Sequence, residues 1–128
     1  DFDRDGDLDL LITTNNGPAY LYRNDQTDGN RSIRFRLIGT KSNRDAIGAA
    51  VRIFQNGRDG RLEQTQSRLV RGGSSYLSQS ELPVTFGVGK NETIDRVTIV
   101  WPGGAHEEYK DLPTGKAYEI IEHKGITK

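Results

Sequence analysis

Apolar residues recur at every second position in several short segments of this chain, and this pattern constrains the fold most strongly. Ile33, Phe35 and Leu37 alternate with polar residues, and the same period recurs within residues 47–53, 84–88 and 97–101. Because side chains alternate between the two faces of a β-strand, each segment predicts a strand with one buried face. No segment has the apolar spacing of an amphipathic helix over three turns. The pattern predicts an all-β fold, a β-sandwich or partly closed barrel of about seven strands.

Turn-forming residues separate these segments. The sequence Asn-Gly-Arg-Asp-Gly at 56–60 predicts a hairpin loop, which a polar strand over 61–71 follows. Residues 72–75 predict a further turn, and Pro-Gly-Gly at 102–104 ends a strand. Residues 106–109 and 118–121 complete the expected set of strands.

Composition excludes several classes of protein. The 18 basic and 18 acidic residues balance, so nothing global favours nucleic acid or a membrane surface as a partner. No cysteine is present, which excludes disulfides and cysteine-bound zinc. No apolar run approaches the roughly 20 residues of a membrane helix. A signal peptide and methionine are also missing, so we expect a piece of a longer protein.

The first nine residues form an acidic loop with five Asp and one Arg, a local charge of −4 in a chain whose net charge is zero. Calcium takes about six to eight oxygen ligands, and alternate Asp residues around the turn at Gly6 can converge on one ion. Without a cation, neighbouring carboxylates about 5–6 Å apart repel by roughly 0.7 kcal/mol per pair. We expect side-chain ligands from Asp1, Asp3, Asp5 and Asp9, and the backbone carbonyl of Asp7.

An EF-hand does not explain this loop. The twelfth residue of an EF-hand loop is an acidic ligand and helices flank it, whereas here the twelfth residue is Ile12 and a strand-like run follows. The alternative to calcium binding is a solvated acidic turn.

The chain divides into two expected parts. Residues 1–23 predict a metal loop, a strand, the turn Asn-Asn-Gly-Pro at 15–18 and a returning strand. Residues 24–31 are polar and turn-rich, which indicates a linker. Residues 32–128 then form the β module.

Two resemblances support this division. Residues 1–10, Asp-Phe-Asp-Arg-Asp-Gly-Asp-Leu-Asp-Leu, resemble the calcium loop of FG-GAP/VCBS repeats, the blades of integrin-type β-propellers. Residues 33–122 resemble the ASPIC/UnbV domain, found after such repeats in cartilage-acidic-protein-like and bacterial secreted proteins. The segments that carry this second resemblance are Ala-Ile-Gly-Ala at 46–49, Arg-Gly-Gly-Ser-Ser-Tyr-Leu-Ser-Gln at 71–79, Phe-Gly-Val-Gly at 86–89 and Val-Trp-Pro-Gly-Gly at 100–104.

The resemblances imply the end of a propeller blade joined to a sandwich-like module, exported from the cell. They transfer calcium ligation to Asp1, Asp3, Asp5, Asp7 and Asp9, and they transfer no catalytic residue. A propeller needs several blades, whereas this chain has one incomplete blade. We therefore expect residues 1–23 to be displaced or mispaired when isolated from the other blades.

Other candidate sites have simpler explanations. His106 and His123 lack the spacing of zinc proteases, so surface positions are favoured. The serines near 74–78 lack a nucleophile elbow. Gly-Val-Gly-Lys at 87–90 is not a P-loop, because Asn91 follows the lysine, and these glycines are expected to end a strand. Asn30 also begins an N-glycosylation pattern, as Asn91 does, which matters only in a eukaryotic secretory source.

Aromatic and basic residues leave a carbohydrate ligand open. Trp101 is expected in the core, whereas Tyr76 and Tyr109 are candidates for exposed aromatics. Five arginines predict either a basic face for anionic polysaccharide or a solvated sheet face: Arg31, Arg34, Arg36, Arg44 and Arg52.

Together these features predict a non-catalytic, calcium-binding adhesion or recognition module of a larger secreted or cell-surface protein. Its expected partners are the upstream β-propeller and an extracellular protein or polysaccharide. We expect neither nucleic acid binding nor membrane insertion. The alternative is a carbohydrate-binding accessory module, and an enzyme would need a pocket with convergent carboxylates or histidine.

Overall fold

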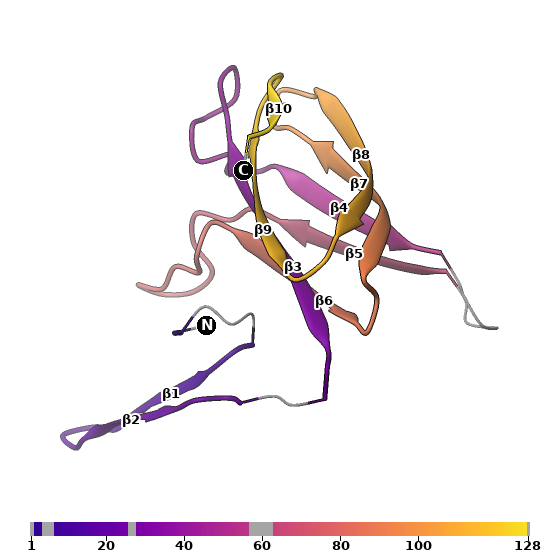
Figure 1. Ribbon diagram of the computed structural model, residues 1–128. Coiled ribbons are helices and arrows are strands. Elements are labelled where there is room, and N and C mark those ends of the chain that lie inside the picture. Colours follow the sequence, from indigo (N-terminus) through magenta and orange to yellow (C-terminus); the bar gives the residue numbers. More distant parts are fainter. Residues whose placement is uncertain (1, 4–6, 26–27, 57–62, 128) are drawn as a thin grey trace.

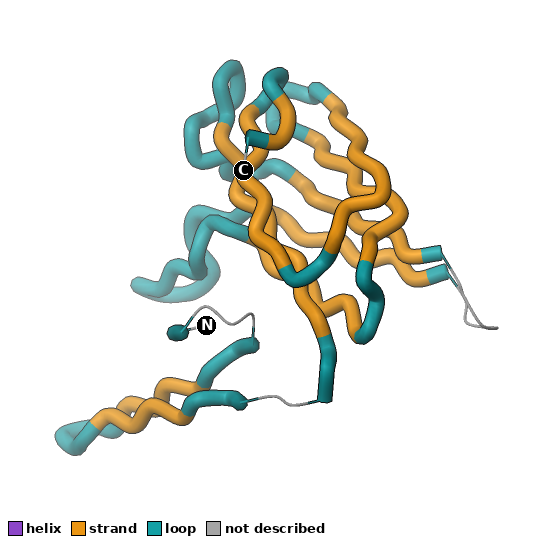
Figure 2. Tube along the Cα trace, viewed as in Figure 1, coloured by secondary structure: helices purple, strands orange, loops and turns teal. Residues whose placement is uncertain are grey.

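The computed structural model describes residues 2–3, 7–25, 28–56 and 63–127 of the chain. These residues form ten β-strands and no helix, which confirms the predicted all-β class (Figure 2). No helix long and apolar enough to cross a membrane occurs within the described ranges. The strands are β1 (Leu10–Thr13), β2 (Ala19–Tyr22), β3 (Arg31–Ile38), β4 (Ala50–Gln55), β5 (Gln64–Leu69), β6 (Val84–Gly89), β7 (Thr93–Val100), β8 (His106–Pro113), β9 (Lys116–Ile121) and β10 (Gly125–Ile126).

Strands β3 to β10 form a sandwich of two four-stranded sheets, hereafter the sandwich. One sheet has the order β10-β9-β3-β6 and the other β5-β4-β7-β8, so no closed barrel forms (Figure 1). All neighbours are antiparallel except β3 and β9, which run parallel with Phe35 opposite Tyr118. Strands far apart in sequence therefore lie side by side in the first sheet.

The inward positions of both sheets supply a single core. Phe35 lies at its centre, with ring centroids 6.1 Å from Phe86 in an edge-on arrangement and 5.8 Å from Tyr118 in a stacked one. Trp101 is also buried, as the sequence predicts. Each large apolar side chain removed from water contributes about 1.5–3 kcal/mol. The alternating segments form strands because their buried faces belong to this core: Ile33, Phe35 and Leu37 in β3, Val51 and Ile53 in β4, Val84, Phe86 and Val88 in β6, and Val97 and Ile99 in β7.

The structure corrects the predicted strands in two places. The alternation predicts that Ile47 shares the buried face of Ala49, but Ile47 is 42% exposed in a loop before β4. Ala46 and Gly48 have positive φ angles of 52° and 94°, which turn the chain there and interrupt the alternation. The two-residue strand β10 was also missed. Residues 57–60 of the loop predicted over 56–60, and residues 61–62 at the start of the predicted polar strand, lie outside the described residues.

A separate hairpin precedes the sandwich. Strands β1 and β2 pair antiparallel from Leu10 opposite Tyr22 to Thr13 opposite Ala19. Asn16 has a positive φ of 55° in the turn, and the Thr14 hydroxyl donates to the Pro18 carbonyl at 2.8 Å. The hairpin extends away from the sandwich at the lower left of Figure 1, and all its residues are exposed. A two-stranded hairpin is marginally stable by itself in water.

Candidate functional site

The acidic loop is closed by Asp9. Its Oδ2 accepts the backbone N–H of Phe2 at 2.6 Å, and its Oδ1 accepts that of Asn24 at 2.9 Å. The hydrogen bond from Asn24, followed by that from Phe2, holds the pKa of Asp9 below its usual value. Asp9 thus joins the start of the chain to the residues that follow β2.

The structure describes three of the five predicted calcium ligands. They are Asp3, Asp7 and Asp9. Asp3 lies 3.8 Å from the Arg23 guanidinium, which also contacts Asp25 at 2.7 Å. Asp1 and Asp5 lie outside the described residues. Within the described ranges, no three acidic, histidine or cysteine side chains converge as a metal cluster.

The donor set fits a hard cation in its chemistry, because carboxylate oxygens are the ligands that calcium prefers. Each Asp9 oxygen accepts a backbone N–H, so the carboxylate lies with both oxygens turned towards the ends of the loop. The five-aspartate ligand set stays a prediction.

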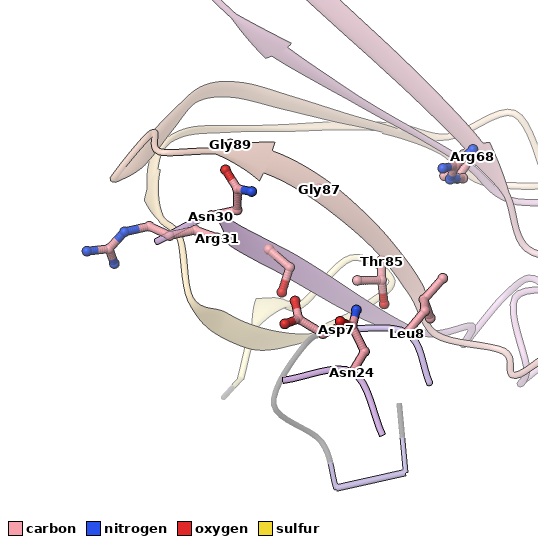
Figure 3. Close-up of a pocket in the computed structure, with 10 residues that line it drawn as sticks. Asp7, Leu8, Asn24, Asn30, Arg31, Arg68, Thr85, Gly87 and Gly89 are labelled. Atoms are coloured by element: carbon pink, nitrogen blue, oxygen red, sulfur yellow. The ribbon is translucent and has the colours of Figure 1, made fainter. Parts of the chain in front are cut away.

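A groove of about 430 Å³ separates the acidic loop from the sandwich (Figure 3). One side is built by the chain before β3: Asp7, Leu8, Asn24 and Asn30. The other side is built by β3, β5 and β6: Arg31, Ser32, Arg68, Thr85, Gly87 and Gly89. Of the predicted calcium ligands that the structure describes, only Asp7 lines this groove, and Asn30 and Arg31, which the sequence singles out for other roles, line it too. The sequence does not identify the remaining lining residues, because they come from segments that lie far apart in the chain.

A buried carboxylate organises the loop after β3. Glu122 is 1% exposed, and its Oε2 accepts the backbone N–H groups of Thr40, Lys41 and Ser42 at 2.7–2.8 Å. The Ser42 hydroxyl donates to Oε1 at 2.8 Å. Burial alone raises the pKa of Glu122, but these hydrogen bonds outweigh it and lower the pKa from 4.5 to about 2. No sequence signal distinguishes Glu122 from an exposed strand-end glutamate.

Three of the four segments that carry the ASPIC/UnbV resemblance, those at 46–49, 71–79 and 100–104, meet near this loop, where the Gly103 N–H donates to the Ser42 hydroxyl at 3.4 Å. The Gly48 N–H donates to the Val70 carbonyl at 2.9 Å, and a Cβ on Gly48 would lie 3.6 Å from Pro102 Cγ. A Cβ on Gly72 would lie 2.9 Å from Ile47 Cδ1. Gly48 and Gly72 therefore lie at packed loop contacts, and the φ of 94° at Gly48 favours glycine there.

The tip of the loop over 74–80 is different. Tyr76 and Leu77 are 88% and 90% exposed, and Leu77 has a positive φ of 50°. Tyr76 is thus the exposed aromatic that the sequence predicts. Tyr109 is not, because it is half-buried against the core. Its hydroxyl donates to Glu107 at 2.6 Å, and burial, followed by this contact, raises the pKa of Tyr109 far above its usual value.

The predicted basic face is divided between the two sheets. Arg34 and Arg36 lie on β3, whereas Arg52 lies on β4 of the opposite sheet. Carboxylates also oppose the β3 arginines: Arg34 contacts Glu81, Arg36 lies 3.9 Å from Glu119, and Arg31 lies 3.6 Å from Glu92. A single basic face is therefore wrong, because alternation within a strand does not reveal which sheet that strand joins.

The histidines occupy the predicted surface positions. His106 is exposed on β8, and His123 is exposed in the turn before β10. The His123 ring nitrogen Nε2 lies 4.0 Å from Glu122 Oε1. Ser42, Glu122 and His123 lie close together, but the Ser42 hydroxyl donates to the Glu122 carboxylate. This hydrogen bond stabilises the loop, and it is not the serine-to-base contact of an activated nucleophile.

The chain is similar in sequence to several known proteins. Human cartilage acidic protein 1 is 30% identical over 125 residues, which cover 95% of this chain and 18% of that protein. The proteins of the same name from Mus musculus and Xenopus tropicalis are each 32% identical over 107 residues, which cover 81% of this chain and 16% of theirs. The chain spans less than a fifth of the length of these curated relatives.

A solved structure shows a distant likeness. The crystal structure of a proposed cell adhesion protein from Bacteroides ovatus aligns with a TM-score of 0.41 and 9% identity, over 77% of this chain and 42% of that one. This likeness is too distant to carry a functional argument.

The family match is more extensive. The family model described as ASPIC and UnbV matches residues 39–127, which include the loop over 40–42, the glycine contacts at 48 and 72, and Glu122. The chain therefore belongs to the ASPIC and UnbV family.

Proposed function

We propose that this chain is a non-catalytic adhesion or recognition module of a larger secreted or cell-surface protein, and that its acidic loop binds calcium. The observation that carries the proposal is the closure of that loop by Asp9, which holds Phe2 and Asn24 together. A cation there neutralises the clustered carboxylates and stabilises the same closed arrangement.

The hairpin supports a larger parent architecture. The cross-strand register places Leu10, Ile12, Tyr20 and Tyr22 on one face, and it places Leu11 and Leu21 on the other. All six are exposed. Apolar side chains on both faces are typical of strands covered on both sides. This supports an upstream FG-GAP/VCBS propeller as the partner of β1 and β2.

An extracellular setting and a non-catalytic role have separate support. The relatives of this chain are named for cartilage, which favours a secreted or surface location. The buried acidic group of the sandwich, Glu122, uses its oxygens to brace a loop. These hydrogen bonds favour a structural role for Glu122 over a catalytic one.

Calorimetric titration with calcium chloride tests the proposal. We expect saturable binding that Asp5→Ala removes. Asp45→Ala, which removes an exposed loop carboxylate outside residues 1–9, is the matched control and should bind as the unaltered chain does. Failure of both this chain and a longer chain with its upstream repeats to bind calcium would contradict the metal role.

Carbohydrate binding is the second candidate function, and the exposed ring of Tyr76 favours it. A glycan array with neutral and sulfated polysaccharides tests it. Binding that Tyr76→Ala weakens is expected, and an array without any hit would contradict this role for the tyrosine.

A further inference from the structure

We infer that the groove between the acidic loop and the sandwich is a binding site for one saccharide unit, a ring that carries several hydroxyl groups. The inference rests on the recognition role proposed above. It assigns that role to a location and a class of ligand. Three features of the groove carry it.

The first feature is a glycine that the fold does not require. Gly87 lies inside β6 and faces the groove, where no described atom comes within 4 Å of the position of a Cβ. Its φ is not positive, unlike the φ of 59° at Gly89. Glycine weakens a strand, and it often marks a place where a ligand approaches the backbone closely. Neither packing nor backbone conformation requires glycine at this position. The missing side chain leaves the β6 backbone open to a ligand at the bottom of the groove.

The second feature is an unsatisfied hydroxyl on the same floor. Thr85 precedes Gly87 by two residues, so both lie on the same face of β6. Its Oγ1 is buried and has no hydrogen-bond partner among the described residues. Buried polar groups are normally paired, and an unpaired one costs free energy. Because the Thr85 side chain lines the groove, a rotation about its Cα–Cβ bond would bring this hydroxyl to a ligand hydroxyl, which would supply the missing partner.

The third feature is the mixture of groups in the walls. Asp7 accepts hydrogen bonds, the guanidinium groups of Arg31 and Arg68 donate them, and the side-chain amides of Asn24 and Asn30 do both. Asp7 and Asn24 lie beside Thr85 in Figure 3. A sugar hydroxyl also donates and accepts, so a ring with several hydroxyls matches this set of groups.

The same walls disfavour other ligands. A polyanion would meet the Asp7 carboxylate, and an apolar molecule would find Leu8 as the one large apolar side chain among the lining residues. An added peptide strand needs the edge carbonyls of β6, but the side-chain amide of Gln66 already donates to the Gly87 carbonyl at 2.7 Å. The volume of about 430 Å³ lies within the range of small-ligand sites.

Nuclear magnetic resonance titration of the 128-residue chain tests the inference. The probes are glucose, galactose, mannose, N-acetylglucosamine and glucuronic acid, each added separately. We expect saturable shifts of the Thr85 and Gly87 backbone amides and of the Asn24 and Asn30 side-chain amides with at least one sugar. Absence of saturable shifts with all five would overturn the inference, as would shifts confined to other surfaces.

Two variants locate the binding. Gly87→Val fills the groove floor with a side chain that suits a strand, and it should weaken sugar binding about tenfold or more without lowering the melting temperature. Gly73→Val is the matched control, because Gly73 is exposed outside the groove. Thr85→Val keeps the shape of the side chain and removes the hydroxyl, so it should weaken binding while stability is kept or raised. Sugar binding that neither groove variant weakens would also overturn the inference.

Titration with calcium chloride and then with a chelator separates this inference from the proposed metal role. Sugar binding in a chain that does not bind calcium would refute the metal role and support the groove. Calcium binding without sugar binding would support the metal role and refute the groove as a saccharide site.

Discussion

Ser42 donates both its backbone N–H and its hydroxyl to the carboxylate of Glu122, at 2.7 and 2.8 Å. With Thr40 and Lys41 it forms a cradle of four donors around one buried acid, 82 positions away from Thr40 in the sequence. The end of β9 and the loop after β3 are therefore held together by a single side chain.

Glu122→Gln should destabilise the sandwich by roughly 1–3 kcal/mol, because the amide nitrogen replaces an acceptor with a donor inside the cradle. Urea unfolding followed by Trp101 fluorescence measures the effect. Glu108→Gln, on the exposed face of β8, is the matched control and should change stability little. Equal stability of the two variants would contradict the bracing role of Glu122.

The stability contribution of Glu122 should depend on pH. Hydrogen bonds in the folded state lower its pKa from 4.5 to about 2, so the unfolded chain takes up the proton first as pH falls. The contribution is complete above about pH 4.5 and is lost as pH falls towards 2. Unfolding curves over this range should show that the difference between the unaltered chain and Glu122→Gln shrinks with acidification. A constant difference would mean that the carboxylate charge has no part in it.

Gly39→Ala should destabilise the chain by roughly 1–3 kcal/mol or more, because the added methyl group meets backbone that cannot move away cheaply. A Cβ at this position would lie 2.1 Å from the Asn43 carbonyl oxygen. Gly87→Ala is the comparison, since open space lies above Gly87 in the described structure. Thermal unfolding should show a lower melting temperature for the first variant alone.

Backbone amides of β1 and β2 should exchange with deuterium much faster than those of β3 and β9. The hairpin has no covering layer among the described residues, whereas β3 is buried between two neighbours and the core. Hydrogen exchange measured by mass spectrometry checks this. Calcium should slow exchange around Phe2 and Asn24, whose N–H groups Asp9 accepts, and exchange that calcium leaves unchanged there would count against the metal role.

The sequence pattern predicts much of the sandwich because burial acts on single residues. Phe35 and Trp101 are apolar at alternating positions, so their burial follows from the period of two. Ile47 fits the same pattern but is exposed, because positive φ angles at neighbouring residues redirect the chain. Alanine rarely adopts a positive φ, so the sequence gives no signal that Ala46 turns the chain here.

The groove and the cradle depend on distant pairs, which a local pattern does not specify. Thr85 and Asp7 belong to segments that give no sign of meeting, and Glu122 is indistinguishable from a solvated acid until its donors are located. The predicted loop was recognised from its composition, whereas the bond from Asn24 to Asp9 spans 15 positions. Long-range pairing, set by the whole fold, decides these contacts.

The parallel pairing of β3 with β9 has a consequence for the order in which the protein folds during synthesis. Strand β3 is the first of the sandwich to leave the ribosome, but its central neighbour is Lys116–Ile121, near the other end of the chain. One edge of β3 therefore stays unpaired until residues 116–121 have been made. Pairings between such distant segments form slowly, and the intermediates expose apolar surface that promotes aggregation. The module is thus a candidate for chaperone assistance, and truncation before residue 116 should yield an aggregating product.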